Sequence, residues 1–458
     1  MKNIIFTILL VLITNYALAQ SDESVIQNIY QEQLTNSPIY ENLRYLTKEI
    51  GNRVSGSTQL AASVEYTRHL MNKYQFDRVY LQPVLVPNWI RGKKEIVRII
   101  NSPSLGNRDL NCTALGNSIG TGEQGLMGEV IEINGLEELK KTDNNLINGK
   151  IVFLNQALDN SFINTFDAYD QAYGQRSKGP SQASIKGAIA VIIRSLSISD
   201  DDSPHTGNMR YDERVTKIPA IAISTNDANL LSQIIEKEPQ TKVYLELHCQ
   251  TKEKVLSHNV IGEIKGTQFP DEIITVGGHL DSWDIGEGAH DDAGGCLQAI
   301  EVLRSFRVLG IQPKRTLRAV MWVDEENSGS GNKVYAEKSK ESKETHIAAI
   351  ESDSGVFTPI GFSIDTENEL ALKKIRAWKS YFEPYQLYQF NKGYAGVDIS
   401  PLKNSSILLL GLETVNQRYF TLHHSEKDVF EAVNKRELEL GVAAMTSMVY
   451  LIDKYGIK

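Results

Sequence analysis

Residues 273–281 read Ile-Ile-Thr-Val-Gly-Gly-His-Leu-Asp, an apolar run that ends in a histidine and a carboxylate. A β-branched apolar run of this kind is typical of a buried strand. Further apolar strands are expected at 316–323, 347–350 and 406–410, and they alternate with helices expected at 294–306, 331–338, 370–378 and 437–455. This alternation predicts an α/β fold in which helices cover both faces of a sheet.

Histidines and carboxylates recur close to the carboxyl ends of these predicted strands. After His279 the chain carries His290-Asp291-Asp292, Asp324-Glu325-Glu326, Glu351-Ser352-Asp353 and His423-His424-Ser425. Ligands of open α/β sheets bind beyond the carboxyl ends of the strands, so we expect these side chains to lie along one rim. Two imidazoles and three carboxylates suit a pair of zinc ions that share one bridging carboxylate.

Each cluster also has a structural explanation when it is taken alone. Asp291 and Asp292 open a predicted helix, where the helix dipole favours carboxylates. Glu325 and Glu326 could be a solvated pair, but they follow a buried strand, where adjacent carboxylates repel each other unless a cation neutralises them. Such a pair also permits one carboxylate to ligate a metal while the other accepts a proton. The joint occurrence of the clusters favours the metal site.

Taken together, the clusters resemble the co-catalytic zinc aminopeptidases, whose pattern is His-x-Asp, Asp-Asp before small residues, Glu-Glu, Asp after Glu-Ser, and His-Ser. The order and spacing are most similar to the branch that contains plasma glutamate carboxypeptidase, also called carboxypeptidase Q. The resemblance extends over nearly all of the mature chain and includes residues 53–57 and 396–401. It implies the zinc exopeptidase fold, with a mixed, mostly parallel sheet sandwiched by helices and an inserted β-rich protease-associated domain.

The resemblance also implies a role for each residue of the site. The implied metal ligands are His279 and Asp353 for one zinc, Glu326 and His424 for the other, and Asp291 as the bridge between the two. Glu325 matches the general base, and Asp281 matches the carboxylate that orients His279 through its other ring nitrogen. The family pattern selects Asp291 over Asp292 because an Asp-Ala pair follows it, and His424 over His423 because Ser425 follows it.

Several neighbouring residues carry weaker expectations. Asp428-Val429 stands where the family has Asp-Thr, and Asp428 is expected to orient His424. We favour His290 as a solvent-facing bystander over a substrate contact, and His423 as a packing residue or a residue that supports a metal ligand without binding the metal. The candidates for binding the substrate's amine or carboxylate are Tyr394, Asp398 and Ser354. Structural roles in turns are equally compatible with the sequence at these three positions.

The chain divides into four predicted segments. Residues 1–19 resemble a signal peptide, because Lys2 precedes an apolar run and Ala17-Leu18-Ala19 forms a cleavage signal. Residues 20–106 and 251–458 are expected to form the catalytic domain, and 107–250 the inserted domain. Strands expected at 79–81 and 95–100 are separated by Pro83, Pro87 and Gly92. Export predicts a periplasmic or secreted protein without a membrane segment in the mature form.

Composition narrows the choice of partners. There are 48 Lys and Arg against 57 Asp and Glu, a net charge of −9, and no basic block, which argues against nucleic acid as the main partner. The three cysteines (Cys112, Cys249 and Cys296) form no disulfide framework. We expect Cys296 to be a small buried residue rather than a nucleophile.

The favoured function is an exported di-zinc exopeptidase that hydrolyses dipeptides or short peptides. Two zinc ions per chain would provide a bridging hydroxide, with Glu325 as general acid and base. A broader aminopeptidase acting on longer peptides is the first alternative, and a deacylase or cyclase acting on another amide is a second. A metal-free binding protein is less consistent with a full set of ligands. A homodimer is expected from the resemblance alone.

Overall fold

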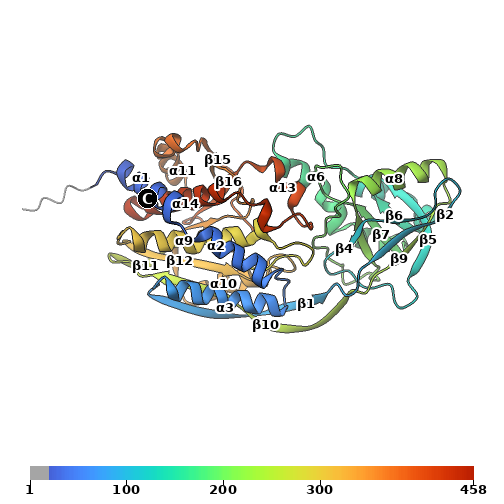
Figure 1. Cartoon of the computed structure of the whole chain (residues 1–458), viewed down its shortest axis with the longest axis horizontal. Helices are drawn as coiled ribbons and strands as arrows, with labels where there is room; N and C mark the ends of the chain where they lie inside the picture. The colour runs from blue at the N-terminus through green and yellow to red at the C-terminus, as the bar shows by residue number, and fades with distance from the viewer. Residues whose placement is uncertain (1–19, 458) are drawn as a thin grey trace, which may run out of the picture.

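A computed structural model describes residues 20–457, and the predicted signal peptide at 1–19 lies outside them. The chain forms two eight-stranded sheets (Figure 1). The main sheet has, in spatial order, the strands β1 (Arg78–Ile90), β10 (Gln250–Ile264), β12 (Arg315–Trp322), β11 (Phe269–His279), β13 (Thr345–Glu351), β16 (Leu408–Thr414), β14 (Pro359–Asp365) and β15 (Gln389–Lys392). Its four central strands, from β12 to β16, are parallel, so their carboxyl ends lie at one rim.

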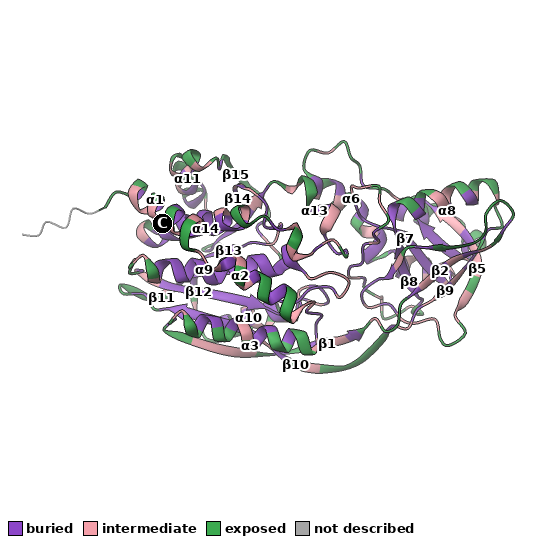
Figure 2. Cartoon of the chain, viewed as in Figure 1, coloured by how far each residue is buried: buried purple, intermediate pink, exposed green. Residues whose placement is uncertain are grey.

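Side chains of the central strands alternate between two helical layers. In β12, Leu317, Ala319 and Met321 pack in the core beneath α9 (Gly294–Val308), α14 (Lys435–Tyr455), α1 (Asp22–Asn36) and α3 (Thr58–Lys73). Val320 and Trp322 belong to the opposite core, where α10 (Ser330–Glu341) contributes Tyr335. Both faces of the central strands are therefore buried (Figure 2). The predicted α/β sheet covered by helices is confirmed.

The second sheet, residues 96–246, is called the second sheet unit below. Its strands in spatial order are β3 (Gly106–Leu110), β2 (Ile96–Ser102), β9 (Lys242–Glu246), β5 (Leu126–Ile133), β6 (Ile151–Leu154), β7 (Ala190–Arg194), β8 (Ala220–Ile223) and β4 (Cys112–Ala114). Helices α4 (Gly135–Lys141), α6 (Thr165–Ser177), α7 (Gly179–Ile185) and α8 (Thr225–Lys237) accompany it. The sheet includes β2, which precedes residue 107, and the assignment of this unit to a protease-associated domain stays a prediction.

A long antiparallel ribbon joins the two sheets. Strand β1 pairs with β10 along its length and continues through Pro83 and Pro87, where the sequence predicted a break. Two features make the prolines tolerable, since a proline cannot donate to a sheet ladder. β1 is the edge strand of the main sheet, and Pro87 falls at a register shift between Val86 and Asn88. The prediction that Pro83 and Pro87 break the strand is therefore wrong.

None of the helices between residues 20 and 457 combines the length and the apolar character needed to span a bilayer.

The core makes a direct prediction about stability. Leu410 of β16 is fully buried in the main core, so Leu410→Ala should lower the free energy of unfolding by about 2–5 kcal/mol. Leu370, which is 70% exposed, provides the matched control, and Leu370→Ala should change it by less than about 0.5 kcal/mol. Urea denaturation followed by circular dichroism measures both. Equal effects of the two variants would contradict the packing described above.

Candidate metal centre

The five predicted ligands meet at the rim formed by the parallel strands. His279 is the last residue of β11, Glu326 follows β12, and Asp353 follows β13. Asp291 lies in the short helical turn η2 (Ala289–Ala293) directly before α9, and His424 follows α13 (Tyr419–Leu422). Parallel strands end at the same edge of a sheet, which explains how residues far apart in the sequence come together.

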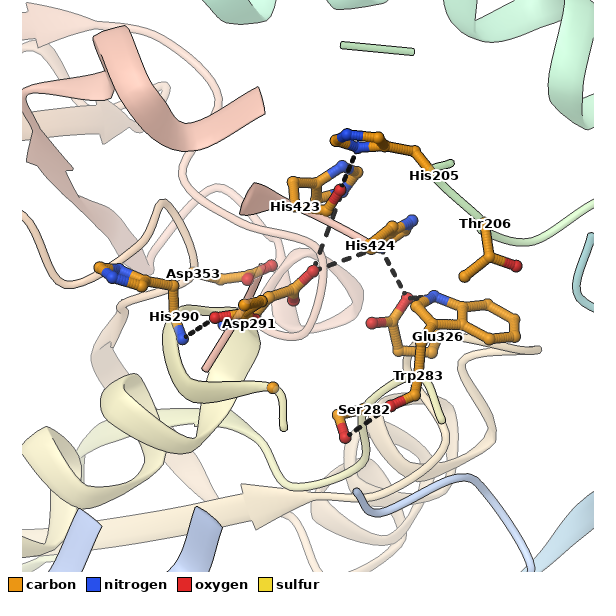
Figure 3. Close-up of polar contacts among 12 residues, drawn as sticks. His205, Thr206, Ser282, Trp283, His290, Asp291, Glu326, Asp353, His423 and His424 are labelled. Atoms are coloured by element: carbon orange, nitrogen blue, oxygen red, sulfur yellow. Dashed lines mark hydrogen bonds and ion pairs between the residues drawn. The ribbon is translucent and has the colours of Figure 1, made fainter. Parts of the chain in front are cut away.

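Asp291 contacts both His279 and His424, and its contact with His424 is drawn in Figure 3. Its Oδ1 is 3.0 Å from Nε2 of His279, and its Oδ2 is 3.2 Å from Nε2 of His424. Each imidazole has a second carboxylate, since His279 Nε2 is 3.4 Å from Asp353 Oδ1 and His424 Nε2 is 3.1 Å from Glu326 Oε2. Each of the two histidines therefore has two carboxylate neighbours, and Asp291 is the neighbour that both histidines share.

The protonation equilibria of these groups follow from their proximity. Burial lowers the pKa of His279, but the Asp353 and Asp291 carboxylates outweigh it and raise that pKa well above its usual value. Burial raises the pKa of Asp291, but hydrogen bonds from His279 and His424 bring it well below its usual value. The mutual attraction of an imidazolium and these carboxylates accounts for both shifts, and a metal ion at the same place would supply positive charge instead.

Asp292, the other candidate for the bridge, binds backbone groups. Its Oδ2 accepts the N–H of His279 at 3.0 Å, and its Oδ1 accepts the N–H of Gly295 at 3.0 Å. A cis peptide bond joins it to Asp291. Asp292 thus connects the end of β11 to the start of α9, while Asp291 faces the imidazoles.

Asp281 also supports the rim through backbone contacts. Its carboxylate accepts the N–H groups of Glu325 and Glu326, at 3.1 and 3.2 Å. Its backbone carbonyl, at 3.0 Å, faces Nδ1 of His279, whereas the carboxylate is 3.9 Å from that nitrogen. The resemblance implies that the carboxylate orients His279, but in the structure the carbonyl makes the closer contact.

Asp428 differs from its expected role. Its carboxylate accepts the N–H groups of Ala289, His290 and Asp291, at 3.1, 2.7 and 3.1 Å. It therefore supports the turn that carries Asp291 and does not orient His424. The nitrogen of His424 that faces away from the carboxylates, Nδ1, lies 3.3 Å from Nη1 of Arg176 instead.

His290 and His423 are both buried. The expectation of a solvent-facing His290 is wrong, because its ring stacks on Phe357 with centroids 4.3 Å apart and its Nδ1 accepts the N–H of Val356 at 3.2 Å. Burial lowers the pKa of His290 to about 4, so the ring is neutral. His423 stacks on His424 with ring centroids 3.5 Å apart.

Glu325 is half-buried at the same rim. Burial, together with Glu326, Asp398 and Asp353, raises the pKa of its carboxyl well above the usual value. A carboxylate in such surroundings accepts a proton more readily than one in water, which suits a general base.

A cavity of about 610 Å³ opens beside Asp353. Its walls come from α6 of the second sheet unit, from β14 and β15, and from residues 393–397. Ser354 and Tyr394 line it, as expected for residues near a substrate. Asp398 is not in this wall but is buried, and burial raises the pKa of its carboxyl to about 8.

Four residues near the centre carried no signal in the sequence. Trp283 donates its indole N–H to Oε2 of Glu326 at 2.6 Å, and Arg176 approaches His424 from α6. His205 and Thr206 reach the His423–His424 turn from the second sheet unit (Figure 3). None of them belongs to a cluster with metal-ligand spacing, and spatial proximity alone identifies them.

Comparison with known proteins agrees with this geometry. The profile of Peptidase family M28 matches residues 259–448. Carboxypeptidase Q of Bos taurus is 32% identical over 413 residues, which cover 90% of this chain and 84% of that protein. Carboxypeptidase Q of Homo sapiens is 31% identical over the same length and coverage. The chain belongs to peptidase family M28.

Solved structures agree with the M28 assignment. A peptidase M28 precursor from Shewanella amazonensis is 32% identical and superposes with a TM-score of 0.89, covering 94% of this chain and 96% of the other. A zinc aminopeptidase from Bacillus subtilis, 22% identical with a TM-score of 0.64 and covering 90% and 94%, shares the fold. The resemblance predicted from the sequence is confirmed, and the M28 chain is a metallopeptidase.

The backbone contacts of Asp428 predict a loss of stability when they are removed. At pH 8, above the value of about 7 to which burial raises the pKa of this carboxyl, Asp428→Ala should lower the free energy of unfolding by about 2 kcal/mol or more, because buried N–H groups lose their acceptor. Exposed Glu431 provides the control, and Glu431→Ala should cost less than about 0.5 kcal/mol. Chemical denaturation in the presence of a chelator measures both, and an unchanged Asp428→Ala variant would refute the supporting role.

Proposed function

We propose that the protein is an exported di-zinc metallo-exopeptidase that hydrolyses dipeptides or short peptides. The observation that carries this proposal is the position of Asp291, which lies 3.0 and 3.2 Å from imidazoles that each have their own second carboxylate. A single carboxylate shared by two such groups is the arrangement that a pair of metal ions requires. Export, two ions per chain and the roles of individual residues all belong to the proposal.

The donor atoms fit zinc. Each proposed position has one imidazole nitrogen, one carboxylate of its own and one oxygen of Asp291, a set of nitrogen and oxygen ligands that leaves room for water or substrate. Within residues 20–457, Oε1 of Glu326 is buried without a hydrogen-bond partner. Such an atom is costly to bury unless a cation or a donor accompanies it. His279 and Asp353 would hold one ion, and Glu326 and His424 the other.

The chemistry divides between the metal ions and the chain. When bound, two zinc ions supply a Lewis acid for the scissile carbonyl and lower the pKa of a water molecule. Glu325 accepts the proton of that water and then donates it to the amine that leaves. Asp281 accepts the backbone N–H groups of both Glu325 and Glu326 and so fixes the turn that carries the proposed base and a proposed ligand.

The cavity beside Asp353 supports a small substrate. Its volume of about 610 Å³ lies in the range of small-molecule sites, which is about 300–1,000 Å³. The relatives named carboxypeptidase Q favour exopeptidase action. An inactive, metal-free binding protein is disfavoured because the sequence keeps all five proposed ligand residues and the proposed base.

Replacement of the proposed base tests the catalytic role. Glu325→Gln should lower kcat for a dipeptide by about 10²–10⁴-fold, since general acid–base catalysis contributes that much, while the variant keeps two zinc ions. Exposed Glu383 gives the control, and Glu383→Gln should retain full activity. Amino-acid release and elemental analysis of the same samples measure the two quantities. A wild-type protein without zinc, or a Glu325→Gln variant that hydrolyses normally, would overturn the proposal.

Substrate length tests the specificity. We expect the value of kcat/KM to be higher for dipeptides than for tetrapeptides or Leu-p-nitroanilide, and an N-acetylated dipeptide to resist hydrolysis. A preference for the longer peptides would favour a broad aminopeptidase. Hydrolysis of non-peptide amides alone would favour a deacylase. Chromatography of the products over a matched peptide series distinguishes the three outcomes.

A further inference from the structure

The turn that carries His424 has an unusual backbone conformation. His424 has φ +59°, in the left-handed region that residues other than glycine seldom occupy. Such a conformation persists only where the surroundings hold it in place. The contacts around residues 421–427 therefore identify what keeps His424 directed at Asp291 and Glu326.

The second sheet unit supplies those contacts. Nδ1 of His205 donates to the backbone carbonyl of His423 at 2.6 Å, and the N–H of Thr206 donates to the carbonyl of His424 at 2.8 Å. Figure 3 shows His205 directly beside His423, on the segment that comes from the second sheet unit. Three polar contacts flank this pair along the same two segments: Ser199 with Thr421, Ser203 with Glu426, and Asp201 with Lys427.

The backbone of the second sheet unit also packs against the imidazole itself. A Cβ atom at Gly207, which has φ +128°, would lie 2.5 Å from Nδ1 of His424 and 2.3 Å from Nη1 of Arg176. Only a glycine fits there. Arg176 is buried, and its Nη1 also donates to the carbonyl of Thr206 at 3.3 Å. The back of the His424 ring is thus enclosed by the second sheet unit.

Glu326 is held from the same side. Trp283, which donates to Oε2 of Glu326, is part of the hydrophobic core of the second sheet unit. Its ring packs at an edge against Trp89, with centroids 6.2 Å apart, and occupies the space that a Cβ at Gly116 would need. The indole therefore reaches the metal centre from a fixed position in that core.

His279, which belongs to the other pair of proposed ligands, is held by different contacts. The backbone N–H of His279 donates to Asp292, and its Nδ1 faces the carbonyl of Asp281. Asp292 and Asp281 both follow β11 of the main sheet in the sequence. The two histidines are thus held by contacts from different parts of the fold.

We propose that the second sheet unit positions one of the two metal sites, the one formed by Glu326 and His424, and that His205 is its positioning residue. The inference rests on the proposed function, because it concerns the same metal ions. It makes zinc affinity at one position depend on a hydrogen bond donated from more than 200 residues away in the sequence.

Two substitutions of similar volume distinguish the effect of the hydrogen bond between His205 and His423 from the effect of packing at residue 205. In His205→Asn the amide nitrogen takes the place of Nδ1 and can still donate to the carbonyl of His423. In His205→Gln the amide reaches the place of Nε2, which has no partner among the described residues. A further variant, His248→Ala, removes a histidine just after β9 that pairs with Glu246 instead.

The experiment is a zinc titration of chelator-stripped full-length protein against a competing chelator, with elemental analysis and circular dichroism on the same samples. His205→Gln should weaken one of the two zinc-binding steps by about 10–100-fold, as expected when support of a metal ligand is lost, and leave the other step unchanged. The zinc affinities of His205→Asn should stay within a few-fold of those of the wild type, and those of His248→Ala should equal the wild-type values.

Equal zinc affinities for His205→Asn and His205→Gln would overturn the inference, as would equal weakening of both steps. If the wild type binds fewer than two zinc ions, the proposed function fails instead. The two failures are therefore distinguishable in a single series of measurements.

Discussion

The structure depends on the placement of several carboxylates within one buried rim. Burial and the neighbouring acidic groups raise the pKa of Asp281 to about 7 and that of Asp398 to about 8. Negative charge of this density is unfavourable away from water unless cations or hydrogen-bond donors accompany it. In the chain alone, the imidazoles of His279 and His424 flank Asp291 and direct their Nε2 atoms at its carboxylate. Metal ions at the same place would relieve the remaining repulsion.

The carboxylates at the rim divide into two kinds. Asp281, Asp292 and Asp428 accept backbone N–H groups and fix the loops that follow β11 and β12 and precede α9. Asp291 and Glu326 instead direct oxygens at imidazole nitrogens. A site that must keep its ligands within a few tenths of an ångström needs both kinds, because ligands on loops are precise only when the loops are fixed. The rigid parallel strands supply the rest of that precision.

Much of this arrangement could be predicted from the sequence. Apolar runs such as 273–276 identify buried strands because the signal is local, whereas the choices of Asp291 over Asp292 and His424 over His423 rest on the family resemblance and stay predictions. Other features depend on packing between distant segments. Nothing near His205 or Trp283 in the sequence indicates a contact with a proposed metal ligand. Likewise, Pro83 and Pro87 predict a broken strand, and only the position of β1 at the sheet edge explains why it continues.

We expect Asp291 to bridge two metal ions. Anomalous diffraction at the zinc absorption edge from crystals of the zinc-loaded protein tests it most directly. The account predicts two peaks about 3.5–4 Å apart, as in other two-metal sites, one on each side of the Asp291 carboxylate, with His279 at one and His424 at the other. A single peak, or a pair of peaks that Asp291 does not contact, would contradict it.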